Sequence, residues 1–381
     1  MRNLMVMILA VVYCWPCAAA DWPTYHGDAG LRGLSTAALP ESLSVRWSLR
    51  TGSPIALTPI VGSNLIYVAQ ENGTLLAVDQ AGHQVWSSRL DRKEGNPQGN
   101  EESFSTPPLW LAGSVVIGSD QGILRAYDAA TGLLRWSRKV GREIFGAPNT
   151  APEGAGGIIV MSRQDGCLKR MALDSGDVTW AAQPVSRCDA SPAAGAGVAV
   201  FGACDSAVHI LSLKSGEQTG LVKLGDRGPM AGGTALDGHQ AFIGTRDGSV
   251  VCIDVQGARE VWASRCASNE VFTTPAVTST RVIVASTDGK VYCLNRNDGA
   301  ILWQMLVEGN PSSPVVAGDK VVVTSEGRIF LMSLKDGRRL WSAEAGDSAT
   351  SPAVSGNAVI VGTDDGFLVL YGPAPDKKET P

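Results

Sequence analysis

A repeat of roughly 42 residues runs through most of this chain and constrains its fold more than any other feature. Each copy holds four short apolar segments separated by polar turns, and no helical period interrupts them. Its clearest landmark is a glycine that usually follows Asn or Asp, a pair typical of tight turns between antiparallel strands, where both central residues take φ > 0. The fourth copy has Ser206 at this place, and the others have Gly73, Gly122, Gly166, Gly248, Gly289, Gly327 and Gly366.

A second turn glycine and a tryptophan mark the end of the copies. The second turn glycines are Gly82, Gly132, Gly176, Gly216, Gly257, Gly299 and Gly337. A Trp follows four residues later, or five in the fifth copy, and the fourth copy has Gly220 in its place. A residue at one position of every repeat is typical of packing between neighbouring repeats, so we favour this role over stacking platforms for a sugar or quinone. The tryptophans with this predicted role are Trp47, Trp86, Trp136, Trp180, Trp262, Trp303 and Trp341.

Four strands per copy at this period predict an all-β fold, an eight-bladed β-propeller of four-stranded antiparallel blades. The eighth copy, residues 350–372, contains only three strands. A lone strand that contains Trp47, Ser44 to Leu49, lies one repeat length before the corresponding part of the first copy. We therefore expect this N-terminal strand to complete the last blade and close the ring, which also covers an exposed edge. The predicted propeller spans residues 44–372.

The sequence at both ends of the chain predicts segments that lie outside this ring. Arg2, an apolar run from Leu4 to Val12 and three alanines ending at Ala20 indicate a signal peptide over residues 1–20, cleaved between Ala20 and Asp21. The apolar run is too short to span a bilayer. Residues 21–43 have no strand or helix period and are predicted to be an N-terminal extension, and residues 373–381 a disordered tail. Because a signal peptide directs export, we expect the protein to be located in the periplasm or cell envelope.

Composition narrows the range of partners. The formal net charge is −5 and the isoelectric point is near 5.5, so the chain has no basic footprint for nucleic acid or anionic lipid. We therefore expect no nucleic-acid partner, at most a peripheral contact with a membrane, and a monomer. There are four histidines, and no metal-ligand spacing or Ser/His/Asp arrangement is present. The sequence thus offers no catalytic, cofactor-binding or metal-binding set, and we predict that the protein is not an enzyme.

Six cysteines lie beyond the signal peptide: Cys167, Cys188, Cys204, Cys252, Cys266 and Cys293. Cys188 and Cys204 flank a predicted hairpin and are symmetric about Ala196, so paired strands would place them opposite each other. This predicts a cross-strand disulfide in an oxidising compartment, and the alternative is two buried thiols.

Three phenylalanines and one long link indicate where a ligand or partner would bind. Phe104, Phe145 and Phe272 each lie three residues before the proline that opens the first strand of a copy. In a propeller this position lies near the mouth of the central channel, on the face that carries the links and the Asp-Gly turns. The three rings either plug the channel or form a binding rim. Residues 91–103, a long polar link between the first two copies, are the predicted contact loop for a protein partner.

The repeat, S-P-x-V…V-x-V-G-x-x-D-G-x-L-x-x-L-D-x-x-x-G-x-x-x-W, resembles that of the pyrroloquinoline-quinone (PQQ)-like β-propellers. Residues 273–303 and 312–341 match it well, and the opening Asp21-Trp22-Pro23 resembles the start of stand-alone members. One branch of the family contains quinoprotein dehydrogenases, which implies an adjacent-Cys disulfide, a calcium site and a catalytic Asp; none of these can be placed in this sequence.

The other branch, the BamB family, contains propeller subunits of the β-barrel assembly machinery. Similarity to that branch implies a non-enzymatic exported scaffold without a cofactor, whose partner is an outer-membrane assembly component. The alternatives are a PQQ-dependent or sugar-oxidising oxidoreductase and a carbohydrate-binding propeller.

Overall fold

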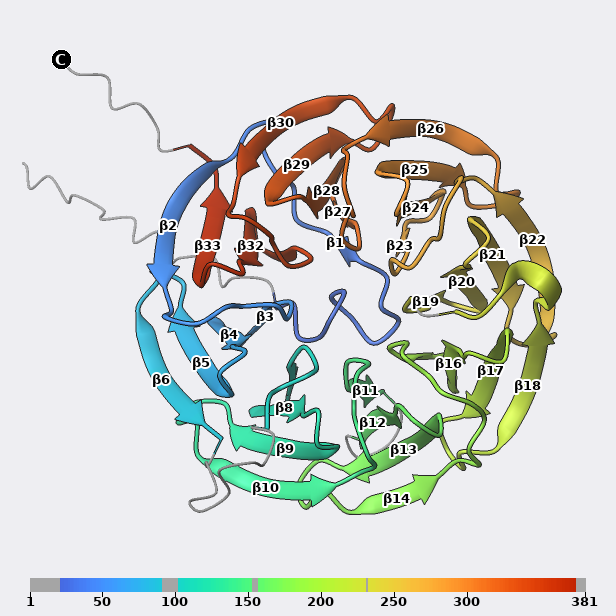
Figure 1. Cartoon of the computed structure of the whole chain (residues 1–381), viewed down its shortest axis with the longest axis horizontal. Helices are drawn as coiled ribbons and strands as arrows, with labels where there is room; N and C mark the ends of the chain where they lie inside the picture. Colours follow the sequence, from blue (N-terminus) through green and yellow to red (C-terminus); the bar gives the residue numbers. More distant parts are fainter. Residues whose placement is uncertain (1–20, 91–101, 153–156, 231, 375–381) are drawn as a thin grey trace, which may run out of the picture.

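The computed structural model describes residues 21–90, 102–152, 157–230 and 232–374. Within these ranges the strands form eight sheets, each with four antiparallel strands, arranged radially around one axis, which confirms the predicted eight-bladed propeller (Figure 1). A single short 3₁₀ helix, η1 (Gly225–Arg227), interrupts the strands of the described part. In that same part of the chain, no helix is long and apolar enough to cross a membrane.

Blades one to four follow the chain from the innermost to the outermost strand. Blade one contains β3 (Ile60–Gly62), β4 (Leu65–Ala69), β5 (Thr74–Asp79) and β6 (Gln84–Arg89). Blade two contains β7 (Leu109–Leu111), β8 (Ser114–Gly118), β9 (Ile123–Asp128) and β10 (Leu134–Lys139). Blade three contains β11 (Asn149–Ala151), β12 (Gly157–Ser162), β13 (Cys167–Ala172) and β14 (Val178–Ala181). Blade four contains β15 (Ala193–Gly195), β16 (Val198–Gly202), β17 (Ala207–Ser212) and β18 (Gln218–Lys223).

Blades five to seven continue in the same order, and blade eight takes its outer strand from the N-terminal part. Blade five contains β19 (Ala235–Asp237), β20 (Gln240–Gly244), β21 (Ser249–Asp254) and β22 (Arg259–Arg265). Blade six contains β23 (Ala276–Val277), β24 (Arg281–Ser286), β25 (Lys290–Asn295) and β26 (Ile301–Leu306). Blade seven contains β27 (Val315–Ala317), β28 (Lys320–Ser325), β29 (Arg328–Ser333) and β30 (Arg339–Glu344). Blade eight contains β31 (Ala353–Ser355), β32 (Ala358–Gly362), β33 (Phe367–Gly372) and β2 (Ser44–Arg50).

The ring closes as the sequence predicts. Strand β2 pairs antiparallel with β33, with Trp47 opposite Leu370 and Leu49 opposite Leu368. The N-terminal strand therefore covers what would be the open edge of the last blade. Buried side chains of blades seven, eight and one form one apolar cluster across this closure, so the two ends of the propeller share a core.

Residues 22–35, from the predicted N-terminal extension, line the inside of the ring. Backbone hydrogen bonds join Trp22 to Val61 of blade one and Pro23 to Trp110 of blade two. Further along, backbone amides of blades four to seven donate to this segment's carbonyls: Ala194 to Ala29, Leu236 to Gly30, Val277 to Arg32 and Val316 to Gly33. The short strand β1 (Leu34–Ser35) then adds to β27 in parallel and makes blade seven five-stranded (Figure 1). The extension is thus an integral part of the propeller.

Two glycines let this segment approach the blades and fold back on itself. A Cβ at Gly30 would lie 2.3 Å from the carbonyl oxygen of Leu236, where no side chain fits. Gly33 has φ +58, and a Cβ there would lie 2.4 Å from the ring of His26. His26 is itself buried, with its ring nitrogens 2.7 Å from the Leu31 carbonyl and 2.8 Å from that of Pro314. The glycines therefore fix the path of the chain across the channel.

Six of the tryptophans named above share one environment within the described residues. Each ring lies against the second turn glycine of the following blade, where a Cβ would come within 2.5–2.8 Å of the ring. Each indole N–H also donates to a carbonyl of that next blade, at 2.8–3.0 Å. The pairs are Trp47–Gly82, Trp86–Gly132, Trp136–Gly176, Trp180–Gly216, Trp262–Gly299 and Trp303–Gly337. Trp341 differs, because blade eight has no such turn, and its ring meets Tyr371 edge-on.

Candidate functional site

The links between blades and the turns between second and third strands lie on one face of the ring, which we call the turn face. Backbone hydrogen bonds join these two sets of loops in blade after blade. Examples are Glu71 N to Pro54 O, Asp120 N to Ser103 O and Thr287 N to Glu270 O, at 3.1 Å each. This face carries the residues for which the sequence predicts a binding role.

The three phenylalanines predicted at the channel mouth have different environments. Phe104 is 5% exposed and belongs to the core between blades one and two. Phe145 is 47% exposed, with the guanidinium carbon of Arg163 4.5 Å from its ring centroid. Phe272 is partly buried and lies 5.6 Å from the guanidinium of Arg246. The three rings thus differ in exposure and in their partners, and backbone hydrogen bonds place residues 22–33 along the inner strands of the ring.

Arg163 is held rigidly beneath Phe145. Its Nε lies 2.5 Å from Asp189 Oδ1, and its Nη1 lies 2.6 Å from Glu143 Oε1. Burial raises the pKa of Asp189, but hydrogen bonds from Arg163 and Arg187 outweigh this effect, so its pKa lies below the ordinary value. The carboxylate thus stays charged and keeps the arginine in place. An exposed ring over an oriented guanidinium is a platform suited to protein contacts, where aromatic and Arg side chains are enriched.

The structure corrects the predicted arrangement of Cys188 and Cys204. Ala193 pairs with Val200 and Ala194 with Ala199, which centres the hairpin between residues 196 and 197 rather than on residue 196. Both cysteines lie just outside the two paired strands β15 and β16. Both cysteines are free thiols, so the predicted disulfide is not formed in this structure. Burial raises the pKa of Cys188 to about 12, which makes it a poor nucleophile.

Other predicted positions lie partly or wholly outside the described residues. Ala20, on one side of the predicted cleavage point, is among the undescribed residues, whereas Asp21 accepts a hydrogen bond from the Ser63 amide at 3.0 Å. Of the predicted contact loop, residues 91–101 are also outside the described part. The remaining end of that loop is anchored, because Glu102 pairs with Arg125 at 2.6 Å.

The donor set of a quinoprotein site is not assembled among the residues that the structure describes. The sequence contains no adjacent cysteines. Over the described ranges, no group of three or more His, Cys, Asp or Glu side chains is arranged to hold a metal ion. The residues present therefore do not fit a PQQ–calcium pair, and we derive no chemical step through one.

The sequence did not indicate the structural role of Tyr25. Its hydroxyl lies 2.8 Å from Ser313 Oγ and 3.0 Å from Thr274 Oγ1, which ties the N-terminal segment to blades six and seven. Burial raises the pKa of this hydroxyl, so it stays protonated and able to donate. The only signal for this role in the sequence is the opening Asp21-Trp22-Pro23, through its family resemblance.

These features define the class of protein as an eight-bladed propeller built from PQQ-like repeats. Comparison with known families then gives a more specific result: a model described as "Outer membrane protein assembly factor BamB" matches residues 82–226 and 204–370, together well over half of the chain. The chain belongs to this family.

Individual relatives agree with this assignment. The chain is similar to outer membrane protein assembly factor BamB of Escherichia coli (strain K12), with 23% identity over 342 residues, 72% of this chain and 84% of the relative. The crystal structure of BamB from Moraxella catarrhalis superposes with a TM-score of 0.69 at 21% identity, covering 89% of this chain and 99% of the other. A quinohemoprotein alcohol dehydrogenase from Comamonas testosteroni has a TM-score of 0.75 at 13% identity, covering 95% and 82%. Similarities at such identities show the fold alone.

Proposed function

We propose that this protein is a non-enzymatic scaffold of the cell envelope that takes part in outer-membrane protein assembly by binding a protein partner through its turn face. Membership of the BamB family supports the assembly role. The predicted signal peptide supports export to the periplasm, and we propose a monomer that associates with the membrane at most peripherally. We propose that the protein acts without a nucleic-acid partner and without a cofactor.

The observation that carries the proposal is the platform of Phe145 and Arg163. Phe145 is 47% exposed although its neighbours Ile144 and Gly146 are buried, and Arg163 is fixed by two carboxylates. Side chains that are already ordered lose little conformational freedom on binding, so they contribute efficiently to an interface. We propose that residues 91–103, which the sequence predicts to be a contact loop, add to this contact surface.

The test is capture of partners from an envelope extract by the tagged full-length protein, followed by mass spectrometry. We expect Phe145→Ala to reduce capture of the principal partner at least fivefold. Val178→Ala is the matched control, because Val178 is 49% exposed but lies on the outer strand β14. We also expect deletion of residues 91–101 to weaken capture.

Two outcomes would count against the proposal in different ways. Full capture by both Phe145→Ala and the deletion variant would show that the contact surface lies elsewhere. Enrichment of no envelope protein would remove the scaffold role itself. Saturable binding of PQQ with calcium, followed by absorbance, would favour the dehydrogenase alternative.

A further inference from the structure

The outer strand of each blade ends its sheet, and β26 of blade six differs from the other outer strands. It pairs with β25 on one side and has no described strand on the other. Such edges can pair with another chain, and proteins usually protect them with charged side chains. Among the described residues, every other outer strand of six or seven residues contains a charged side chain, whereas β26, with the sequence ILWQML, contains none. The outer strand β14 also lacks charge, but it is only four residues long.

The exposed side chains of β26 are also unusually apolar. Three large apolar side chains of this strand are exposed, whereas each of the other described outer strands has at most one. They are Ile301 at 47%, Leu302 at 46% and Leu306 at 55%. None of the three belongs to the apolar clusters on the two sides of blade six. These side chains are therefore available to a partner and are not part of the core.

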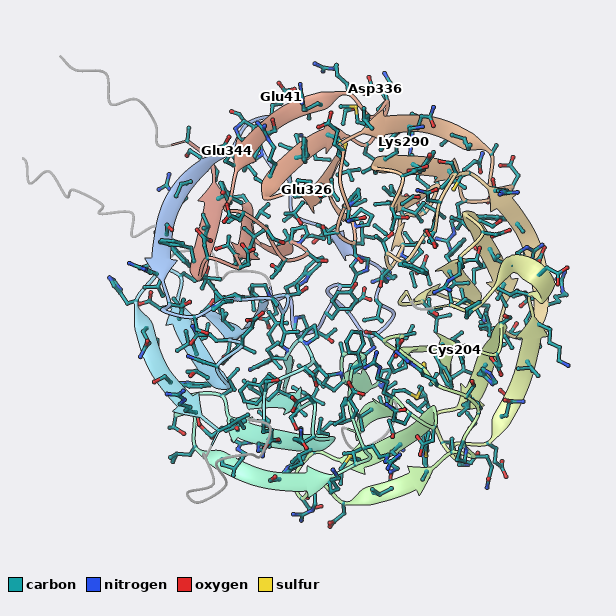
Figure 2. The ribbon with its side chains drawn as sticks, viewed as in Figure 1. Glu41, Cys204, Lys290, Glu326, Asp336 and Glu344 are labelled. Carbon is teal, nitrogen blue, oxygen red and sulfur yellow. The ribbon has the colours of Figure 1, made fainter. Side chains whose placement is uncertain are left out.

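Charged residues border this edge but do not lie on it. Lys290 of β25 is paired opposite Leu306 and lies beside β26 near the outer edge of the ring (Figure 2). Asp298 precedes the strand and Glu308 follows it. The turn of blade seven next to this strand carries both signs, with Lys335, Asp336 and Arg338. The surroundings thus favour neither sign, and β26 itself offers no opposite charge to a charged ligand.

The shape of the ring indicates which kind of occupant fits this edge. The outer strands lie on a convex circumference, so a second folded ring would touch β26 over little more than one strand (Figure 1). A six-residue strand is roughly 20 Å long, whereas a stable dimer interface buries roughly 1,200–2,000 Å² of surface. An extended segment suits a single edge better, because main-chain hydrogen bonds provide its affinity. The propeller already contains two such additions, since β2 completes blade eight and β1 adds to blade seven.

We propose that β26 binds an extended, uncharged segment of a partner protein, which adds to blade six as a fifth strand. Its backbone would hydrogen-bond along residues 303–306, which pair with β25 in continuous register. Its apolar side chains would pack beside Leu302 and Leu306. A charged side chain at the same place would lose water without meeting an opposite charge on the strand. Because β26 lies on the outer side of the ring and not on the turn face, this inference goes beyond the proposed function.

The probe is a fluorescein-labelled peptide, Gly-Ser-Thr-Leu-Gln-Leu-Thr-Ser-Gly, titrated with the full-length protein and followed by fluorescence anisotropy. One matched peptide carries N-methyl groups on its five central residues, which removes backbone donors and leaves the side chains unchanged. The other replaces both leucines with lysine. We expect the first peptide to bind at least tenfold more tightly than the methylated peptide and at least fivefold more tightly than the lysine peptide. Equal binding of the first peptide and either control would overturn the proposal.

Substitutions on β26 locate the binding, and each has a control at the same position of the neighbouring outer strand β22. Leu302→Lys should weaken the first peptide at least fivefold, whereas Val261→Lys should not, although Val261 is 41% exposed and also precedes its tryptophan. Gln304→Lys replaces an exposed polar residue and so leaves the core intact, and it should weaken the peptide similarly. Its control is Ala263→Lys, which is exposed directly after Trp262. Unchanged binding by both β26 variants would show that the peptide binds elsewhere and would overturn the proposal.

Hydrogen exchange followed by mass spectrometry gives an independent position for the peptide. Bound peptide should slow exchange in residues 301–306 and leave residues 259–265 of β22 unchanged. Binding without protection of β26 would overturn strand addition even if the affinities followed the expected order. The scaffold proposal is tested separately, because capture of envelope partners through Phe145 concerns the turn face.

Discussion

The joint between blades one and two and the joint between blades four and five occupy equivalent places in the ring but are formed by different residues. A joint here is the contact between the outer strand of one blade and the second turn of the next blade. In the first, Trp86 of β6 lies on Gly132, where a Cβ would be 2.5 Å from the ring. In the second, Gly220 of β18 stands where the tryptophan would be, and Ala258 stands where the glycine would be. A Cβ at Gly220 would lie 2.8 Å from the Cβ of Ala258.

This difference shows that each joint is a unit of two residues. A large ring on one blade requires that the facing turn have no side chain. When the ring is absent, the turn carries a methyl group even though Ala258 has φ 46, a left-handed conformation that favours glycine. The methyl group fills part of the space that the missing indole leaves.

The largest effect is expected for Trp86→Ala. This change removes a buried indole and its hydrogen bond to the Ala129 carbonyl at 3.0 Å, and leaves a cavity between two blades. We expect the free energy of unfolding, measured by denaturant titration, to fall by about 3–5 kcal/mol. The control is Val85→Ala on the same strand, where Val85 is 49% exposed and the change should cost about 0.5 kcal/mol or less. Similar losses for both would show that Trp86 has no special role in the joint.

The next effect is expected for Gly220→Trp, which adds a ring without removing the facing methyl group. Overpacking against Ala258 should lower the free energy of unfolding by about 3 kcal/mol. Adding Ala258→Gly recreates the pairing of the other joints, so the double variant should recover at least about 1 kcal/mol of this loss. The same denaturant titrations on the two single variants and the double variant give the coupling. Strict additivity would contradict the two-residue unit.

The sequence was sufficient to predict the blades, the closing strand and the regular joints, because each depends on residues that repeat at one position. It misplaced the turn of blade five. Gly257 is the glycine nearest to the expected place, but the residue with φ > 0 is Ala258. The distance to Trp262 is then four residues, as in the other copies that have both this turn and a tryptophan. Residue identity alone favoured the glycine, whereas the backbone register places the alanine at the turn.

The candidate site was less predictable for physical reasons. The path of residues 22–35 rests on hydrogen bonds to the backbone of the inner strands, which leave no pattern in side chains. The sequence indicated that the phenylalanines share one position in their repeats. It did not indicate that Phe104 is buried whereas Phe145 is exposed, because burial depends on the neighbouring blade.

An intermediate effect is expected for Gly132→Ala, which adds a methyl group opposite a tryptophan. Gly132 has φ +73, so alanine there costs roughly 1–2 kcal/mol for the backbone alone, and contact with the Trp86 ring adds to this. We expect a total loss of about 2 kcal/mol in the free energy of unfolding. In a Trp86→Ala background the ring is gone, so only the backbone cost should remain. An equal loss in both backgrounds would mean that the ring and the turn do not interact.

The smallest effect is expected for Gly257→Ala. This variant tests whether Gly257 or Ala258 is the turn residue of blade five. Gly257 does not have positive φ, and a Cβ there would meet Asp254 Oδ2 at 2.8 Å and Arg259 Nε at 3.1 Å. Both atoms are ends of flexible side chains that can move aside, so the loss should stay within about 0.5 kcal/mol. Gly299→Ala is the matched comparison, because Gly299 has φ +72 and faces Trp262 at 2.6 Å, and it should cost about 2 kcal/mol. If denaturant titration gave the same large loss in the free energy of unfolding for both variants, Gly257 would be the turn residue. The pairing of Gly220 with Ala258 would then not explain this joint.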